Sequence, residues 1–149
     1  MLHISRALFP ARILLIAQGI YFALTGAWPL LHLPSFLAVT GPKTDLWLVQ
    51  TVGALLLVMG AVMILAGLRK PTPEVLLLAV AGAAALAAID ILFVCQRVIS
   101  PIYLLDAAAQ AIILAAWLAV ALFHRHAARH VPPTGRDRFA GHLAIVPQS

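Results

Sequence analysis

The sequence predicts an all-α membrane protein, folded as a four-transmembrane-helix antiparallel bundle with both termini in the cytoplasm. Of its 149 residues, 63% are hydrophobic and only 10% are charged, whereas a soluble domain has about 25% charged residues. The mean hydropathy is +1.02. Because one membrane span needs about 20 apolar residues, this length has room for four helices with short connections.

Proline and basic residues delimit the expected spans. Pro29 and Pro34 close the first span, since proline interrupts the hydrogen bonding of a helix. Arg69 and the following Pro71 end the second, and Pro101 suits the first turn of the fourth. The spans are expected at residues 11–31, 46–68, 74–96 and 101–123.

The positions of Lys and Arg predict the orientation, because short loops rich in these residues stay in the cytoplasm. One side of the predicted bundle holds most of the 10 basic residues, whereas the other side holds only Lys43 and Arg97. Both termini and the loop after residue 68 are therefore expected inside. Residues 1–124 form the predicted membrane domain, and residues 125–149 form a basic cytoplasmic tail.

Small residues recur at helical spacing and predict close packing between the spans. Gly53, Gly60 and Gly67 are seven residues apart in the second span, and Gly19 and Gly26 repeat this interval in the first. Small residues let helix backbones approach closely where lipid supplies no hydrophobic driving force. We expect internal packing, with docking of a partner subunit as the alternative. Alanine has the same predicted role at Ala79, Ala83, Ala87, Ala108, Ala111, Ala115 and Ala119.

The few ionisable side chains within the spans indicate a polar cluster. Asp90 lies about two turns from the outer end of the third span, and Asp106 lies one to two turns into the fourth, so both are expected in the outer leaflet. Such residues usually face the bundle interior and a partner, and Arg97 is expected to pair with one of them. Polar residues at helical spacing complete the predicted cluster: Gln18, Tyr21, Thr25, Gln50, Tyr103 and Gln110.

Three interpretations of this cluster remain open. It is an interhelical hydrogen-bond network that fixes helix register, or an outward-open pocket for a lipid, a quinone-like compound or another small amphipathic molecule. The third interpretation is a proton-coupled carrier in which Asp90 exchanges a proton. The pocket would use Asp90, Asp106, Gln50, Gln110 and Tyr103.

Other classes of function lack their required residues. Cys95 is the only cysteine, so the chain has no paired redox motif or cysteine-rich metal site. No two histidines are expected at one depth in the bundle, which argues against haem. The basic residues flank apolar spans and form no nucleic-acid-binding domain. We therefore expect no cofactor, no metal and no enzymatic activity, because no nucleophile with a base is present either.

Two segments carry a resemblance to known proteins. Residues 40–53 read TGPKTDLWLVQTVG, and residues 100–106 read SPIYLLD. They look like segments of small bacterial four-helix membrane proteins, and the layout of the chain is similar to the loosely defined DoxX-like group. The resemblance implies a location in the bacterial inner membrane and assigns no site residues.

Two functions follow as expectations. The first is a non-catalytic accessory or structural subunit of a larger membrane complex, of respiratory or photosynthetic type, whose partners are other membrane subunits or a second copy of the chain. The second is binding or transport of a small molecule through the outer-leaflet polar cluster.

Overall fold

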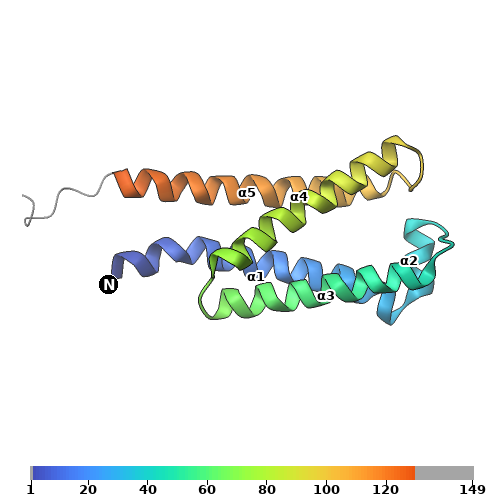
Figure 1. Cartoon of the computed structure of the whole chain (residues 1–149), viewed down its shortest axis with the longest axis horizontal. Helices are drawn as coiled ribbons and strands as arrows, with labels where there is room; N and C mark the ends of the chain where they lie inside the picture. The colour runs from blue at the N-terminus through green and yellow to red at the C-terminus, as the bar shows by residue number, and fades with distance from the viewer. Residues whose placement is uncertain (1, 130–149) are drawn as a thin grey trace, which may run out of the picture.

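The structure is a computed structural model that describes the backbone of residues 2–129 and the side chains of residues 9–123. All regular structure in residues 2–129 is helical, which confirms the predicted all-α class. Figure 1 shows the helices α1 (Leu2–Leu31), α2 (Leu33–Thr40), α3 (Leu46–Leu68), α4 (Pro73–Cys95) and α5 (Tyr103–Arg129).

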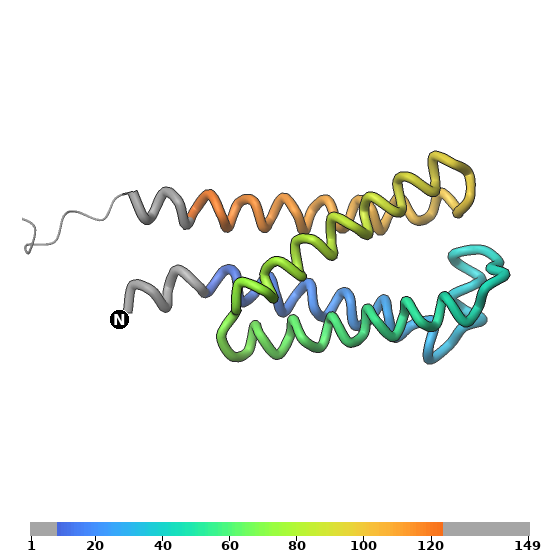
Figure 2. The backbone as a smooth tube through the Cα atoms, in the orientation of Figure 1, coloured from blue at the N-terminus to red at the C-terminus, as the bar shows by residue number. Residues whose placement is uncertain are grey.

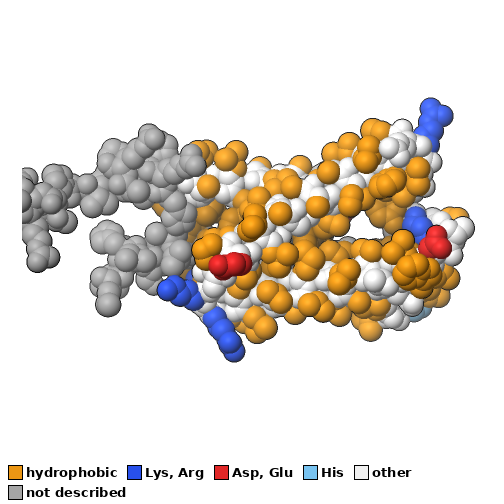
Figure 3. Space-filling model, in the orientation of Figure 1, with side chains coloured by type: hydrophobic (Ala, Val, Ile, Leu, Met, Phe, Trp, Pro, Cys, Tyr) orange, Lys and Arg blue, Asp and Glu red, His pale blue; other side chains and the backbone are white. Residues whose placement is uncertain are grey.

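Four segments of these helices are long and apolar enough to cross a membrane. Each differs from its predicted span by two residues at most. Figure 3 shows hydrophobic side chains over the middle of the molecule, while the Lys, Arg, Asp and Glu side chains visible on this face lie toward its two ends. These features indicate a multi-pass membrane protein. The candidate spans are Phe9–Leu31, Leu46–Leu68, Pro73–Cys95 and Tyr103–Phe123.

The connection between the first two spans contains a helix that the sequence analysis did not predict. The side chain of His32 caps α2 by accepting a hydrogen bond from the Ser35 backbone N–H at 3.2 Å, and Pro34 occupies the first helical turn. Proline fits there because the first N–H groups of a helix have no partner within it. The Trp28 ring packs edge-on against Phe36, with ring centres 5.6 Å apart. The helix α2 therefore folds back against the end of α1.

The predicted tail begins within a helix. The backbone of α5 continues to Arg129, beyond the expected start of the tail at residue 125. The basic side chains of this segment, and all of residues 130–149, lie outside the described residues.

Glycines bring the backbones of α1 and α3 into contact. A Cβ atom on Gly19 would lie 2.7 Å from the carbonyl oxygen of Gly60, and one on Gly53 would lie 2.7 Å from that of Gly26. Residue numbers rise along one helix as they fall along the other. Figure 2 shows these two helices side by side, and α4 makes most of its contacts with α5. The four spans therefore form two closely packed pairs.

Arg12 of α1 binds the C-terminus of α3. Its Nε donates to the carbonyl oxygen of Gly67 at 2.8 Å, and its Nη2 donates to that of Leu68 at 2.7 Å. The last carbonyl groups of a helix have no partner within the helix and carry the negative end of its dipole. The Arg12 side chain thus completes the C-terminus of α3.

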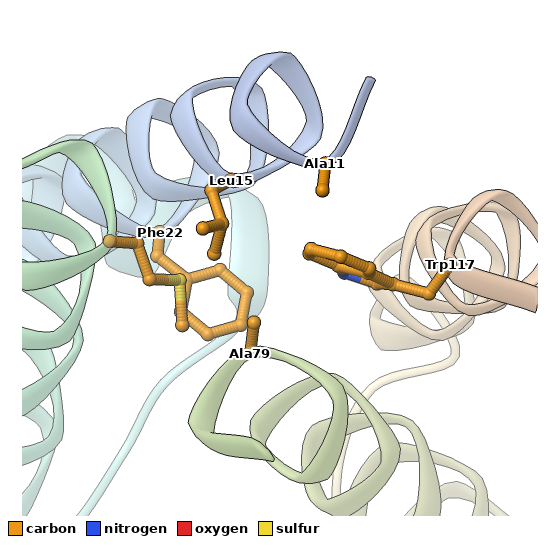
Figure 4. Packing of buried hydrophobic residues seen from close by; sticks show 6 residues of the cluster. Ala11, Leu15, Phe22, Ala79 and Trp117 are labelled. Carbon is orange, nitrogen blue, oxygen red and sulfur yellow. The ribbon is translucent and has the colours of Figure 1, made fainter. Parts of the chain in front are cut away.

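A central hydrophobic cluster joins the two pairs. Figure 4 shows Trp117 of α5 reaching toward Ala11 of α1, with Ala79 of α4 facing Phe22. The side chains of Leu15 and Phe22 are fully buried there. Met63 of α3 belongs to the same cluster, so the core lies where α1 and α3 meet α4 and α5.

For α5 the prediction of internal packing by alanine is wrong, while its alternative, docking of a partner, stays a prediction. On α4 the predicted alanines Ala79, Ala83 and Ala87 are buried, but those of α5 are exposed. The inward face of α5 carries Gln110 and Trp117 instead. Their polar atoms need partners away from lipid, and this requirement sets the rotation of the helix. The exposed alanines are Ala108, Ala111, Ala115 and Ala119.

Candidate functional site

Two carboxyl groups meet near the turn that joins α4 to α5. Asp90 lies in the last two turns of α4 and is only 6% exposed, while Asp106 lies in the first turn of α5. Because the turn reverses the chain, the two groups lie within hydrogen-bonding reach of each other. The local fold therefore places both acids at one level.

Asp106 is held by donors from two helices. The hydroxyl of Tyr21, from α1, donates to Asp106 Oδ1. The amide Nε2 of Gln110, one turn further along α5, donates to Asp106 Oδ2 at 3.4 Å. Both oxygens of Asp106 therefore accept a hydrogen bond. Together Tyr21, Asp90, Asp106 and Gln110 form what we call the acidic cluster.

Two buried atoms of the acidic cluster have no hydrogen-bond partner among the described residues. They are Asp90 Oδ2 and Gln110 Oε1, and Gln110 is only 1% exposed. Leaving a buried polar atom unpaired costs about 1–3 kcal/mol. Both atoms are acceptors when Asp90 is ionised, so a molecule offering N–H or O–H groups would satisfy them.

The buried side chain of Gln18, unlike the acidic cluster, has hydrogen-bond partners for both its amide nitrogen and its amide oxygen. Gln18, which is 1% exposed, donates through Nε2 to the Ala79 carbonyl oxygen at 2.8 Å. Its Oε1 accepts a hydrogen bond from Trp117 Nε1 at 2.8 Å. Trp117 lies about three helical turns from Asp106, roughly 16 Å along α5. Gln18 therefore joins three helices, as the interpretation of an interhelical hydrogen-bond network expects, but it lies outside the acidic cluster.

Trp117 was not predicted as a site residue, although its position in the sequence indicates that it faces the bundle interior. It follows Gln110 by seven residues and therefore lies on the same face of α5. Since a buried indole N–H usually has a partner, Gln18 on the first span was an available acceptor.

The end of α2 covers the start of α5. The ammonium of Lys43 lies 5.0 Å from the centre of the Tyr103 ring and donates to the Thr40 carbonyl oxygen at 3.1 Å. Partial burial lowers the pKa of Lys43 below its ordinary value. The half-buried Tyr103 lies next to the side chain of Thr40 and within electrostatic reach of Asp90 and Asp106. Tyr103 thus borders the acidic cluster.

Two predicted members of the cluster, Gln50 and Arg97, lie elsewhere, and a third, Thr25, lies at its edge. Gln50 is exposed on α3. Arg97 is exposed in the α4–α5 turn, and no ion pair joins it to Asp90 or Asp106 among the described side chains; its φ of 61° belongs to the turn geometry. Thr25 lies next to the Tyr21 side chain and donates to the Tyr21 carbonyl oxygen at 2.8 Å, so it adjoins the cluster while its hydroxyl is satisfied within its own helix. Helical spacing alone did not distinguish these positions from the clustered ones.

An apolar groove of about 270 Å³ runs beside the acidic cluster, between α1 and α5. Gln18 and Tyr21 are its polar members. Because Tyr21 also donates to Asp106, the groove and the cluster share a side chain. The other lining residues are Leu14, Ala17, Ala109, Ile112 and Ile113.

The arrangement suits recognition of an amphipathic molecule, with polar acceptors next to an apolar groove.

Within the described side chains, no group of three His, Cys, Asp or Glu residues is placed to hold a metal ion. No family model matches the chain, and neither the curated proteins nor the solved structures give a match.

Proposed function

We propose that the protein is a non-catalytic membrane protein that binds or transports a small amphipathic molecule, such as a lipid or a quinone-like compound. The observation that carries this proposal is the pair of unsatisfied acceptors, Asp90 Oδ2 and Gln110 Oε1. A network that served only to fix helix register would satisfy its own members, as the bonds of Gln18 do. The acidic cluster leaves two of its buried acceptors without a partner.

The groove supports the amphipathic character of the ligand. Apolar walls with a few convergent polar groups are typical of small-molecule sites. Tyr21 belongs to both the groove and the acidic cluster, so one molecule can place an apolar chain against α1 and α5 and its headgroup near Asp106.

The proposal includes a topology. The four spans form an antiparallel bundle in the bacterial inner membrane, with both termini in the cytoplasm and the α4–α5 turn outside. The basic pair Arg69 and Lys70 between α3 and α4 supports this orientation, because such loops stay in the cytoplasm. The acidic cluster then lies in the outer leaflet, and its ligand reaches it from that leaflet.

A second candidate function is that of an accessory subunit in a larger membrane complex. The exposed alanine face of α5 favours it, since small residues let another helix approach closely. A variant such as Ala111→Leu would then disrupt assembly while leaving the acidic cluster unchanged, because Ala111 is exposed.

Native mass spectrometry of the protein purified in a mild detergent tests the proposal. We expect a retained small molecule in the wild type and in Asp45→Asn, which removes an exposed carboxylate outside the cluster. We expect its loss in Asp106→Asn. Equal retention in both variants, or no bound molecule at all, would contradict the ligand-binding function. A stoichiometric complex with other membrane proteins that Ala111→Leu dissolves would favour the subunit function instead.

A further inference from the structure

The acidic cluster has an excess of hydrogen-bond acceptors. Its donors, the Tyr21 hydroxyl and the Gln110 amide, both bind Asp106. The buried atoms that remain unpaired are the oxygens Asp90 Oδ2 and Gln110 Oε1. An alkylammonium group has three N–H donors and no acceptor, so it complements this arrangement better than a hydroxyl, which is both donor and acceptor.

The charge of the cluster has the complementary sign. Two carboxylates that share a site repel each other, so one of the two keeps its proton. Asp90 and Asp106, which lie within reach of each other, together carry at most one negative charge. Among the described side chains no Lys or Arg forms an ion pair with either acid. The nearby ammonium of Lys43 is directed at the Tyr103 ring and the Thr40 carbonyl oxygen. A buried charge in a membrane is costly without a partner, and a single cation would neutralise it.

The groove indicates the size of the ligand's apolar part and the side from which the ligand approaches the acidic cluster. Its volume of about 270 Å³ is slightly below the usual range for ligand pockets, about 300–1,000 Å³, which favours a single apolar chain. Lys43 has the same charge as an ammonium and covers the α2 side of the cluster. Of the described side chains, Tyr21 is the one that lines the groove and also contacts an acid of the cluster, so we infer that a cationic ligand would reach the cluster past Tyr21, between α1 and α5.

We propose that the ligand is an amphiphile with a primary ammonium headgroup and one apolar chain, and that the ammonium binds Asp90 Oδ2 and Gln110 Oε1. This inference rests on the proposed ligand-binding function and adds the chemical class of the headgroup.

Matched probes test the headgroup directly. The full chain carries three tryptophans, and Trp28→Phe with Trp47→Phe leaves Trp117, which is hydrogen-bonded to the groove residue Gln18, as the reporter. In phosphatidylcholine nanodiscs at pH 7, its fluorescence is followed during titration with dodecylamine or with 1-dodecanol. The two probes have the same chain, and the amine is protonated at this pH. We expect saturable binding of dodecylamine at least about tenfold tighter than that of dodecanol, or about 1.4 kcal/mol.

Variants and controls separate the inference from the proposed function. Asp90→Asn should lower the affinity for dodecylamine to that for dodecanol, whereas Asp45→Asn should leave it unchanged. If Asp90→Asn does not fold, Gln110→Met should weaken amine binding in the same direction. Equal binding of amine and alcohol would overturn the ammonium headgroup and leave the proposed function standing. If neither probe binds saturably, the ammonium headgroup is overturned as well. The proposed function is decided separately, by whether a small molecule copurifies with the protein in the mass-spectrometry experiment.

Discussion

Replacing Gly60 by alanine should separate α1 from α3. The new Cβ would lie 2.5 Å from the Gly19 carbonyl oxygen and 2.6 Å from the Ala23 nitrogen, where ordinary contacts begin at 3.4 Å. Both contacts are with backbone atoms, which cannot rotate away as a side chain does. The two helices must therefore move apart by about 0.9 Å, a gap that forfeits a quarter to a half of the dispersion attraction between facing atoms.

The expected cost of Gly60→Ala follows from two opposing effects. Overpacking costs about 1–3 kcal/mol, and alanine returns up to about 1 kcal/mol through its higher helix propensity. We expect a net loss of about 1–2 kcal/mol in the free energy of unfolding. Gly82→Ala is the matched control, because its Cβ would meet the mobile Cε of Met59 at 3.1 Å. It should be neutral or stabilising by up to about 1 kcal/mol.

Equilibrium unfolding in mixed micelles of dodecyl maltoside and SDS measures this difference. The unfolding midpoint of Gly60→Ala should fall at a lower SDS fraction than those of the wild type and of Gly82→Ala. If Gly60→Ala is as stable as Gly82→Ala, the backbone contact between α1 and α3 does not limit their approach, and the packing argument fails.

Three further substitutions test separate contacts. Gln18→Leu leaves the Trp117 N–H unpaired, and at about 0.6 kcal/mol for each interhelical hydrogen bond it should lower the free energy of unfolding by roughly 1 kcal/mol in the same assay; unchanged stability would show that Gln18 does not hold the helices together. Arg12→Met exposes the last carbonyl groups of α3 and should cost about 0.3–1 kcal/mol, seen as faster hydrogen exchange at the α3 C-terminus; no change there would contradict the capping role. Lys43→Met removes the contact with the Tyr103 ring, worth about 0.5–1 kcal/mol, so hydrogen exchange in α2 should accelerate, and unaltered exchange would mean that this contact does not hold α2.

Sequence patterns predicted the spans well because hydropathy is a sum over many residues. The basic pair after residue 68, followed by Pro71, predicted the end of α3 at the residue where the structure has it. Proline at position 34 was harder to interpret, because it is compatible with the end of one helix and with the first turn of the next. That ambiguity is why no helix was predicted between the first two spans.

The acidic cluster was predictable only in part, because helical periodicity gives the faces of a helix without their rotation in the bundle. On α5 both the alanine stripe and the polar stripe through Asp106 and Gln110 have helical spacing. Contacts from other spans decide which stripe turns inward: Tyr21 binds Asp106, and Gln18 binds Trp117. The exposure of Arg97 is determined by the backbone of the α4–α5 turn, and helical periodicity does not predict the conformation of a turn.

Binding of a cationic headgroup to Asp90 should change the vibrations of this carboxylate, and infrared difference spectroscopy measures them. The spectrum of the wild type in nanodiscs is recorded before and after dodecylamine is added, and the experiment is repeated with Asp90→Asn. We expect a change in the carboxylate-stretch bands of the wild type that is absent from the variant. A ligand-induced band of equal size in both proteins would show that the amine does not act at Asp90 and would contradict the account.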